Sequence, residues 1–166
     1  MNFIIFGGSG FIGTHLIKLL KQECVKDGDK IYDLDIVMPG EEGVVPGVVE
    51  KIEGVEYIRL DVRKEIEFNF QPTDKDIIFN LAAVHRTPGH PDYAYFETNI
   101  LGAENVTAFA EKFNIKKILF TSSIAPYGAA EELKTEETIP TPNTPYGISK
   151  LTAEKIHTIW QGKNPE

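Results

Sequence analysis

NFIIFGGSGFIGTHL, the stretch from Asn2 to Leu16, decides how the rest of the chain is interpreted. A short run of strand-forming apolar residues gives way to three glycines at every third position, and a helix-like pattern follows. Gly7 can adopt the backbone angles of a tight turn, Gly10 lets the main chain approach a ligand, and Gly13 lets a helix lie close to a sheet. The order predicts a strand, a glycine turn and a helix whose first N–H groups face an anion such as a pyrophosphate.

A carboxylate is expected about 20 residues after such a turn, where it accepts hydrogen bonds from the ribose of a dinucleotide. The segment KIYDLDIV supplies two acids. Asp35 lies at the end of the predicted second strand and Asp33 lies one alternation earlier, and the sequence leaves both open. An acid at this place repels the additional phosphate of NADP, so the pattern favours NAD as the cofactor.

Composition narrows the class of protein. The chain has 166 residues, which suits one domain, and a formal net charge of -8. That charge and the lack of a basic stripe argue against a nucleic-acid partner. The single cysteine, Cys24, has no Cys or His at metal-ligand spacing, so we expect no metal site and a reducing compartment. No leader-like segment and no apolar run of membrane-spanning length are found, so the sequence predicts a soluble cytoplasmic protein.

Short strand-forming runs alternate with longer helical patterns, which is typical of a parallel sheet with crossover helices. An apolar stripe with three- and four-residue spacing predicts a helix from Tyr95 to Phe113. Thr144 can cap, and Pro145 can begin, a second helix that runs to Trp160. The Gly-, Pro- and Glu-rich segment from Pro39 to Gly54 is interpreted as a loop with room for a short helix. Strands are predicted at Asn2–Phe6, Lys30–Ile36, Glu56–Leu60, Asp76–Ala82 and Lys117–Ser122.

A second group of polar residues lies in the last third of the chain. The segment TPYGISK places Tyr146 and Lys150 four residues apart, on one face of a predicted helix. Upstream, Ser122 and Ser123 end the fifth predicted strand. A phenol is a poor base at neutral pH until a nearby cation stabilises its phenolate, and a lysine ammonium can do this. A serine hydroxyl can hold a substrate oxygen while a proton moves and a hydride passes to or from a nicotinamide.

Taken together, the motifs resemble those of the extended short-chain dehydrogenase/reductases, the group of NAD-dependent nucleotide-sugar epimerases, dehydratases and reductases. The resemblance covers nearly the whole chain. GGSGFIG is similar to the family's Gly-x-x-Gly-x-x-Gly motif, and LDVRK, FNLAAV, ETNILGAENV, TSSIAPYG and YGISK resemble later motifs in the proper order. The resemblance implies a doubly wound, Rossmann-type parallel sheet.

The same resemblance implies a set of cofactor contacts. Asp61 would bind the adenine amine with Val62 beside the ring, and Asn99 would organise the active-site helix. Lys150 would also hydrogen-bond the nicotinamide ribose. The remaining residues that the resemblance assigns to cofactor binding, beside the three glycines, Asp35 and Tyr146, are Phe11, Ile12, Leu81, Ala82 and Ala83.

For catalysis, the family pattern counted back from Tyr127 implies Ser123 as the catalytic serine, with Ser122 structural. Tyr146 and Lys150 would complete the set. His85, Arg86 and Thr87 could touch a sugar, although a polar surface loop is the simpler interpretation of their segment. His15, His90 and His157 are interpreted as surface or packing residues.

Departures from the family pattern bear on the chemistry. Asn80 stands where the family's strand-four signature usually has histidine. The family's 4,6-dehydratases usually carry Thr-Asp-Glu in the serine region, and Ile124 and Ala125 cannot do the work of the acid and the glutamate. We therefore expect epimerisation of a nucleotide-sugar through a transient keto-sugar. A reductase or dehydrogenase of another carbonyl compound, or an NAD-binding sensor without catalysis, are the alternatives.

The family pattern also bears on extent and assembly. It has a sixth buried strand and a smaller C-terminal substrate domain, so residues 1–166 are interpreted as an NAD-binding domain that lacks these parts. We expect the 166-residue chain to be inactive on sugars by itself. The resemblance further implies a homodimer through the helices over residues 95–113 and 144–160.

Overall fold

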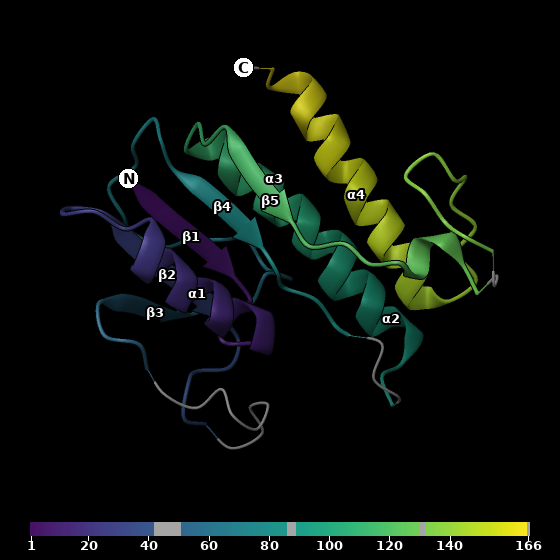
Figure 1. Cartoon of the computed structure of the whole chain (residues 1–166), viewed down its shortest axis with the longest axis horizontal. Helices are drawn as coiled ribbons and strands as arrows, with labels where there is room; N and C mark the ends of the chain where they lie inside the picture. Colours follow the sequence, from purple (N-terminus) through teal and green to yellow (C-terminus); the bar gives the residue numbers. More distant parts are fainter. Residues whose placement is uncertain (42–50, 86–88, 130–131, 166) are drawn as a thin grey trace.

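One parallel sheet forms the centre of the protein, which is described here from a computed structural model covering residues 1–41, 51–85, 89–129 and 132–165. The sheet has the order β3-β2-β1-β4-β5 (Figure 1). Its described strands are β1 (Asn2–Phe6), β2 (Lys30–Asp35), β3 (Val55–Arg59), β4 (Ile77–Asn80) and β5 (Lys117–Phe120). Every pairing is parallel, with Ile4 opposite Tyr32 on one side and Ile78 on the other. The predicted doubly wound α/β fold is confirmed, with the strand order of its first five strands.

Helices follow β1, β4 and β5 along the chain. They are α1 (Phe11–Glu23), α2 (Asp92–Tyr95), the π-helix η1 (Phe96–Leu101), α3 (Gly102–Lys112), the 3-10 turn η2 (Ala125–Tyr127) and α4 (Pro145–Lys163). The predicted cap of the last helix is confirmed, because Thr144 Oγ1 accepts a hydrogen bond of 3.0 Å from the amide of Gly147. The helix predicted over residues 95–113 is present as α2, η1 and α3 in succession. Most of the predicted loop Pro39–Gly54 lies outside the described residues.

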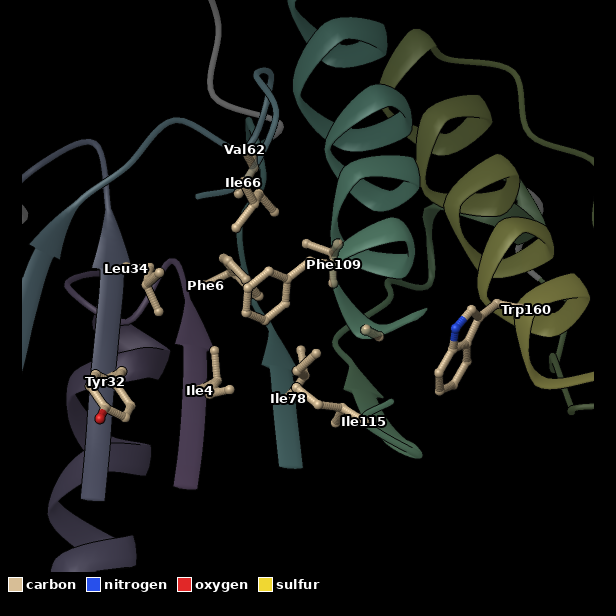
Figure 2. Packing of buried hydrophobic residues seen from close by; sticks show 12 residues of the cluster. Ile4, Phe6, Tyr32, Leu34, Val62, Ile66, Ile78, Phe109, Ile115 and Trp160 are labelled. Atoms are coloured by element: carbon tan, nitrogen blue, oxygen red, sulfur yellow. The ribbon is translucent and has the colours of Figure 1, made fainter. Parts of the chain in front are cut away.

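Alternating side chains of the central strands build a core on each face of the sheet. Phe3 and Ile5 point toward α1 and pack with Ile17 and Leu20 of that helix. Ile4 and Phe6 belong to the opposite cluster, which α3 and α4 cover. Figure 2 shows this larger cluster, in which the ring of Phe109 lies edge-on to Phe6 at a centroid distance of 5.8 Å. The helices therefore cover both faces and leave the carboxyl ends of the strands open for a site.

The described strands end one or two residues before the predicted ends at four places. Ile36, Leu60 and Ala82 lie beyond the last paired residues of β2, β3 and β4, and the fifth strand ends at Phe120. The first three continue the apolar run of their strands past the last paired residue. They line a cavity at this end of the sheet.

Candidate functional site

A cavity of about 360 Å³ lies at the carboxyl ends of the central strands. The cavity lies at β1, from which the chain adds β2 and β3 on one side and β4 and β5 on the other. Ligands of open α/β sheets bind where the strand order reverses in this way. The lining residues are Gly7, Ser9, Gly10, Leu34, Asp35, Ile36, Val37, Leu60, Asp61, Val62, Arg63, Leu81, Ala82, Ala83, Val84 and Thr98. Eight residues predicted to bind the cofactor are therefore in the lining.

The glycine turn connects β1 to α1 as the sequence predicted. Gly7 has a φ of +80°, and a Cβ there would lie 2.7 Å from the backbone nitrogen of Ala82. A Cβ at Gly13 would lie 2.5 Å from Gly8 Cα, so α1 sits directly on the turn. Gly10 differs, because its nearest atom would be Gly7 O at 3.4 Å and its open side belongs to the cavity. An anionic group can approach the main chain there without a side chain in the way.

The first turn of α1 is free to receive an anion. Gly10 is the N-cap, and among the described residues no side chain caps the helix and no acid lies in its first turn. The first N–H groups of a 13-residue helix therefore remain available to a ligand, together with the positive end of the helix dipole. The residues present fit the pyrophosphate of a dinucleotide.

The two acids of the second strand occupy different environments. Asp35 lines the cavity, and its carboxylate accepts hydrogen bonds from the amides of Ser9 at 3.1 Å and Val37 at 3.2 Å. Burial raises the pKa of Asp35 above its ordinary value. Asp33 is fully buried and does not line the cavity. The geometry therefore favours Asp35 over Asp33 as the acid that faces a ribose.

Asp61 is positioned at the cavity by a neighbour. Arg63 holds its carboxylate through two nitrogens, with Nε at 2.9 Å from Oδ1 and Nη2 at 2.8 Å from Oδ2. The same pairing lowers the pKa of Asp61. Val62 is buried in the core beside the wall. The sequence did not single out Arg63, which competes with any ligand donor for the Asp61 carboxylate.

Asn99 connects the cavity to the helix that carries Tyr146. Its side-chain oxygen accepts from the amide of Val84 at 2.8 Å, and its side-chain nitrogen donates to Ser149 Oγ at 2.9 Å. Ser149 in turn donates to the carbonyl of Tyr146 at 2.8 Å. Asn99 lies in the π-helix η1, and such widened turns occur frequently at functional sites. Asn99 thus joins Val84 to the start of α4, and its role in organising the active-site helix stays a prediction.

Tyr146 and Lys150 lie one turn apart near the start of α4, and both are buried. The Lys150 ammonium donates to the carbonyl of Thr121 at 2.5 Å and lies 4.1 Å from the ring centroid of Phe120. Burial lowers the pKa of Lys150 to about 8, although the carboxylate of Glu154 acts in the opposite direction. The lysine is therefore held at the end of β5, on the side from which α4 packs.

The two serines after β5 have different partners. Ser122 Oγ bonds to the Glu154 carboxylate of α4. Ser123 Oγ accepts a hydrogen bond of 3.2 Å from the amide of Ala125, at the start of η2. η2 packs against the start of α4, where a Cβ on Gly147 would lie 2.7 Å from the carbonyl oxygen of Ala125. Ser122 is therefore bonded to a side chain and Ser123 to a backbone amide, and the structural and catalytic roles expected of them stay predictions.

His157 has a partner that the sequence did not reveal. Its Nε2 lies 3.1 Å from the side-chain nitrogen of Asn80, and its ring packs on Phe120 at a centroid distance of 4.7 Å. Burial lowers the pKa of His157 to about 4, and the positive charge of Lys150 adds to this shift. His157 therefore packs in the core as predicted and also forms a hydrogen bond with a residue 77 positions earlier in the sequence.

The remaining predicted residues lie around the site. Phe11 and Ile12 are exposed at the start of α1, outside the cavity lining. His85 is exposed with its ring centroid 5.9 Å from that of Tyr146. Arg86 and Thr87 lie outside the described residues. Among the lining residues not predicted to bind the cofactor, Ile36 is the last residue of a predicted strand and Thr98 directly precedes Asn99, and these positions were the available signal.

Two further classes of site are absent from the described part of the chain. No group of three or more His, Cys, Asp or Glu side chains could hold a metal ion there. Nor does any helix among these residues combine the length and the apolar character needed to cross a lipid bilayer.

Comparison with known proteins identifies related sequences. The family model described as "NAD dependent epimerase/dehydratase family" matches residues 3–164. N-acetyl-alpha-D-glucosaminyl-diphospho-ditrans,octacis-undecaprenol 4-epimerase of Escherichia coli O157:H7 is 30% identical over 99% of this chain and 45% of its own. UDP-glucose 4-epimerase of Lacticaseibacillus casei is 31% identical over 94% of this chain and 46% of its own. The chain thus spans about half the length of the curated relatives it matches.

Solved structures agree with the fold. A UDP-galactose 4-epimerase superposes with a TM-score of 0.82 at 23% identity, over 99% of this chain and 52% of its own. The Thermus thermophilus UDP-glucose 4-epimerase in complex with NAD gives a TM-score of 0.79 at 25% identity, over 99% of this chain and 52% of its own.

Proposed function

Because the chain belongs to the NAD dependent epimerase/dehydratase family, we propose that it binds NAD in the cavity at the ends of the central strands. We further propose that the whole protein epimerises a nucleotide-sugar through a transient keto-sugar. The observation that carries the proposal is the cavity itself, in which the open side of Gly10, the uncapped start of α1 and the Asp35 carboxylate surround one space. An acid at the ribose position favours NAD over NADP.

Bound NAD would accept a hydride from a sugar carbon and return it. The chain's own residues then have the task of moving and holding a proton. The Tyr146 phenol would take the proton of the sugar hydroxyl, since Lys150 is held one helical turn away and its ammonium favours a phenolate. Ser123 would orient the same oxygen. The surrounding helix is fixed by Asn99 through Ser149, so the phenol does not have to be ordered at each turnover.

Relatives support the choice of reaction. The E. coli and L. casei proteins are both 4-epimerases by name. Ile124 and Ala125, in the serine region, offer neither an acid nor a base, which argues against dehydration. We therefore propose epimerisation in preference to dehydration. The identities of the sugar and the nucleotide are to be determined by experiment.

A homodimer through α2, η1, α3 and α4 is also proposed. Apolar side chains are exposed on these helices, among them Phe96, Leu101, Ile148 and Ile159. A partner subunit would cover these side chains, since exposed apolar surface is found at protein–protein contacts. Sedimentation at micromolar concentration tests the proposal, and a monomer there would contradict it.

The lone free cysteine fits a reducing, cytoplasmic location.

Ligand titration tests the cofactor. NAD and NADP are titrated into the protein by calorimetry, and we expect tighter binding of NAD. Gly10→Ala should weaken NAD binding at least about tenfold, because a methyl group enters the path of the pyrophosphate. Gly162→Ala is the matched control, since a Cβ at Gly162 would meet no described atom within 4 Å beyond its own helix. Tighter binding of NADP, or equal effects of the two substitutions, would contradict the proposed site.

Product analysis tests the reaction. The protein in its full length is incubated with NAD and a panel of UDP-sugars, and the sugars are followed by proton NMR. An epimerase converts one sugar into its epimer with no net accumulation of NADH. Stoichiometric NADH would instead identify a dehydrogenase, and no change in any nucleotide-sugar would contradict the proposed substrate class.

A further inference from the structure

A fully buried carboxyl group lies beneath the glycine turn. Asp33 is at the centre of β2, opposite Ile5 of β1 and Tyr57 of β3, and its exposed fraction is 0%. It lies on the same face of the sheet as Ile31, the face that α1 covers. Carboxyl groups are almost never fully buried unless they are paired with a cation, and among the described residues no cationic side chain bonds to Asp33. Its burial therefore calls for a function.

The contacts of Asp33 lead to the turn. Oδ2 accepts a hydrogen bond of 2.9 Å from Ser9 Oγ, whereas Oδ1 is buried with no hydrogen-bond partner in the described structure. A Cβ at Gly8 would lie 2.6 Å from Asp33 Cγ, so the carboxyl group supports the turn directly from below. Ser9 also donates its amide to Asp35, which lines the cavity. One residue of the turn is thus held by two acids.

Negative charge is concentrated at this point. Asp33 and Asp35 lie on the same face of one strand, and a bound pyrophosphate would add its own charge at the start of α1. The pKa of Asp33 is raised to about 7, chiefly by burial; the hydrogen bond from the Ser9 hydroxyl opposes the shift and the charge of Asp35 adds to it. The neutral form of Asp33 is consequently available at physiological pH.

We propose that Asp33 is a positioning residue of the glycine turn and that the dinucleotide binds together with one proton, which Asp33 takes from solvent. The inference rests on the proposed binding of NAD. In the free protein the Asp33 carboxyl is partly ionised, and in the complex it is a neutral acid whose Oδ2 still accepts from Ser9. Protonation removes the like charge that would otherwise lie under the pyrophosphate.

Two other titratable groups lie close to Asp33. On its own strand the neighbour is Asp35, whose pKa burial also raises. On β3 it is Tyr57, whose pKa is raised by burial, so the phenol stays neutral. β1 contributes Ile5, and the residues of α1 buried toward the sheet are Gly13, Thr14, Ile17 and Leu20. Asp33→Asn leaves Asp35 in place and therefore distinguishes the proton of Asp33 from that of Asp35.

The experiment measures NAD affinity by calorimetry from pH 6 to pH 8, in phosphate and in Tris. For the unmodified protein we expect affinity to fall about tenfold over this interval, since one proton is linked to binding. The two buffers, which differ in ionisation enthalpy, should report uptake of up to one proton. Asp33→Asn keeps the shape and an acceptor for Ser9 but cannot titrate, so its affinity should not change with pH and should exceed that of the unmodified protein at pH 8.

His15→Gln is the control for an imidazole close to the turn, because histidines ordinarily titrate near neutral pH. His15 is exposed on α1, and its substitution should preserve the tenfold change. A pH-independent affinity of the unmodified protein, or a pH dependence retained in Asp33→Asn, would overturn the inference and leave NAD binding intact. If NAD failed to bind at every pH, the proposed function would be overturned first and the inference with it.

Discussion

Replacement of Gly13 by alanine provides a quantitative test of how α1 packs on the glycine turn. A Cβ at this position would lie 2.5 Å from Gly8 Cα and 2.6 Å from the Gly8 carbonyl carbon. Both are backbone atoms, so no side-chain rotation relieves the overlap. The helix and the turn must move apart, and α1 loses part of its contact with the sheet.

The magnitude follows from two opposing effects. Alanine in place of glycine within a helix stabilises it by up to about 1 kcal/mol. Overpacking of a close-packed site costs about 1–3 kcal/mol, and contact with fixed backbone favours the upper end of that range. Gly162, near the end of α4, has the same helical gain, and beyond its own helix no described atom would lie within 4 Å of its Cβ. We expect Gly13→Ala to be less stable than Gly162→Ala by about 3 kcal/mol, or about 6–12 °C in Tm.

Urea unfolding followed by circular dichroism measures the two free energies, and a thermal scan measures the two Tm values. Equal stability of the variants would refute the reasoning, because the helical gain is common to both. Greater stability of Gly13→Ala would show that the turn and α1 are not in contact as described.

Three further predictions concern α4. Tyr146→Phe should lower turnover of the full-length protein by about 10²–10⁴-fold while NAD affinity measured by calorimetry stays nearly unchanged, since the ring remains and the proton-transferring hydroxyl is lost; retained turnover would contradict the assignment. Burial lowers the pKa of Lys150 to about 8 from 10.5, so the unmodified protein should gain up to about 3 kcal/mol of stability as pH rises from 8 to 10.5. Lys150→Met should be more stable than the unmodified protein at pH 7 and should lack that gain in urea unfolding; a parallel pH dependence would refute the explanation. Burial likewise lowers the pKa of His157 to about 4 from 6.5, so its contribution to stability should fall by up to about 3 kcal/mol between pH 6.5 and 4, whereas the raised pKa of Asp33 acts in the opposite direction. The free energy of unfolding of His157→Leu, relative to that of the unmodified protein, should therefore rise over this interval even though Asn80 loses its partner; a difference that does not change with pH would count against the explanation.

Local patterns were sufficient for much of the fold. The glycine turn, the alternation of strands with helices and the Thr144 cap each depend on a few neighbouring residues, so the sequence could predict them. Strand ends were predicted too far along, because the apolar residues that follow β2, β3 and β4 continue the pattern while lining a cavity instead of pairing. Periodicity alone does not distinguish these two uses of an extended apolar residue.

Contacts between distant segments could not be predicted. Ser9 and Asp33 are 24 positions apart, and Asn80 and His157 are 77 apart, so no local signal links either pair. The choice between Asp33 and Asp35 depended on which carboxylate faces the cavity. Asp35 is the last residue of β2 and lines the cavity, whereas Asp33 lies two residues earlier and is fully buried under the glycine turn. Nor does an apolar stripe reveal the π-helix around Asn99, since the widened turn accompanies contacts with other parts of the chain.

The hydrogen bonds of Asn99 join residues that are synthesised at different times, so one of these bonds can form only late in synthesis. Val84 and Asn99 leave the ribosome early, whereas Ser149 follows Asn99 by 50 positions. At a synthesis rate of 5–20 residues per second, that interval lasts about 2.5–10 s. During this interval strands β1 to β4, whose ends form the cavity, have already been synthesised. The Asn99 side chain does not yet have the Ser149 hydroxyl as its partner. The residues that line the cavity, from Gly7 to Thr98, are therefore synthesised before the phenol of Tyr146.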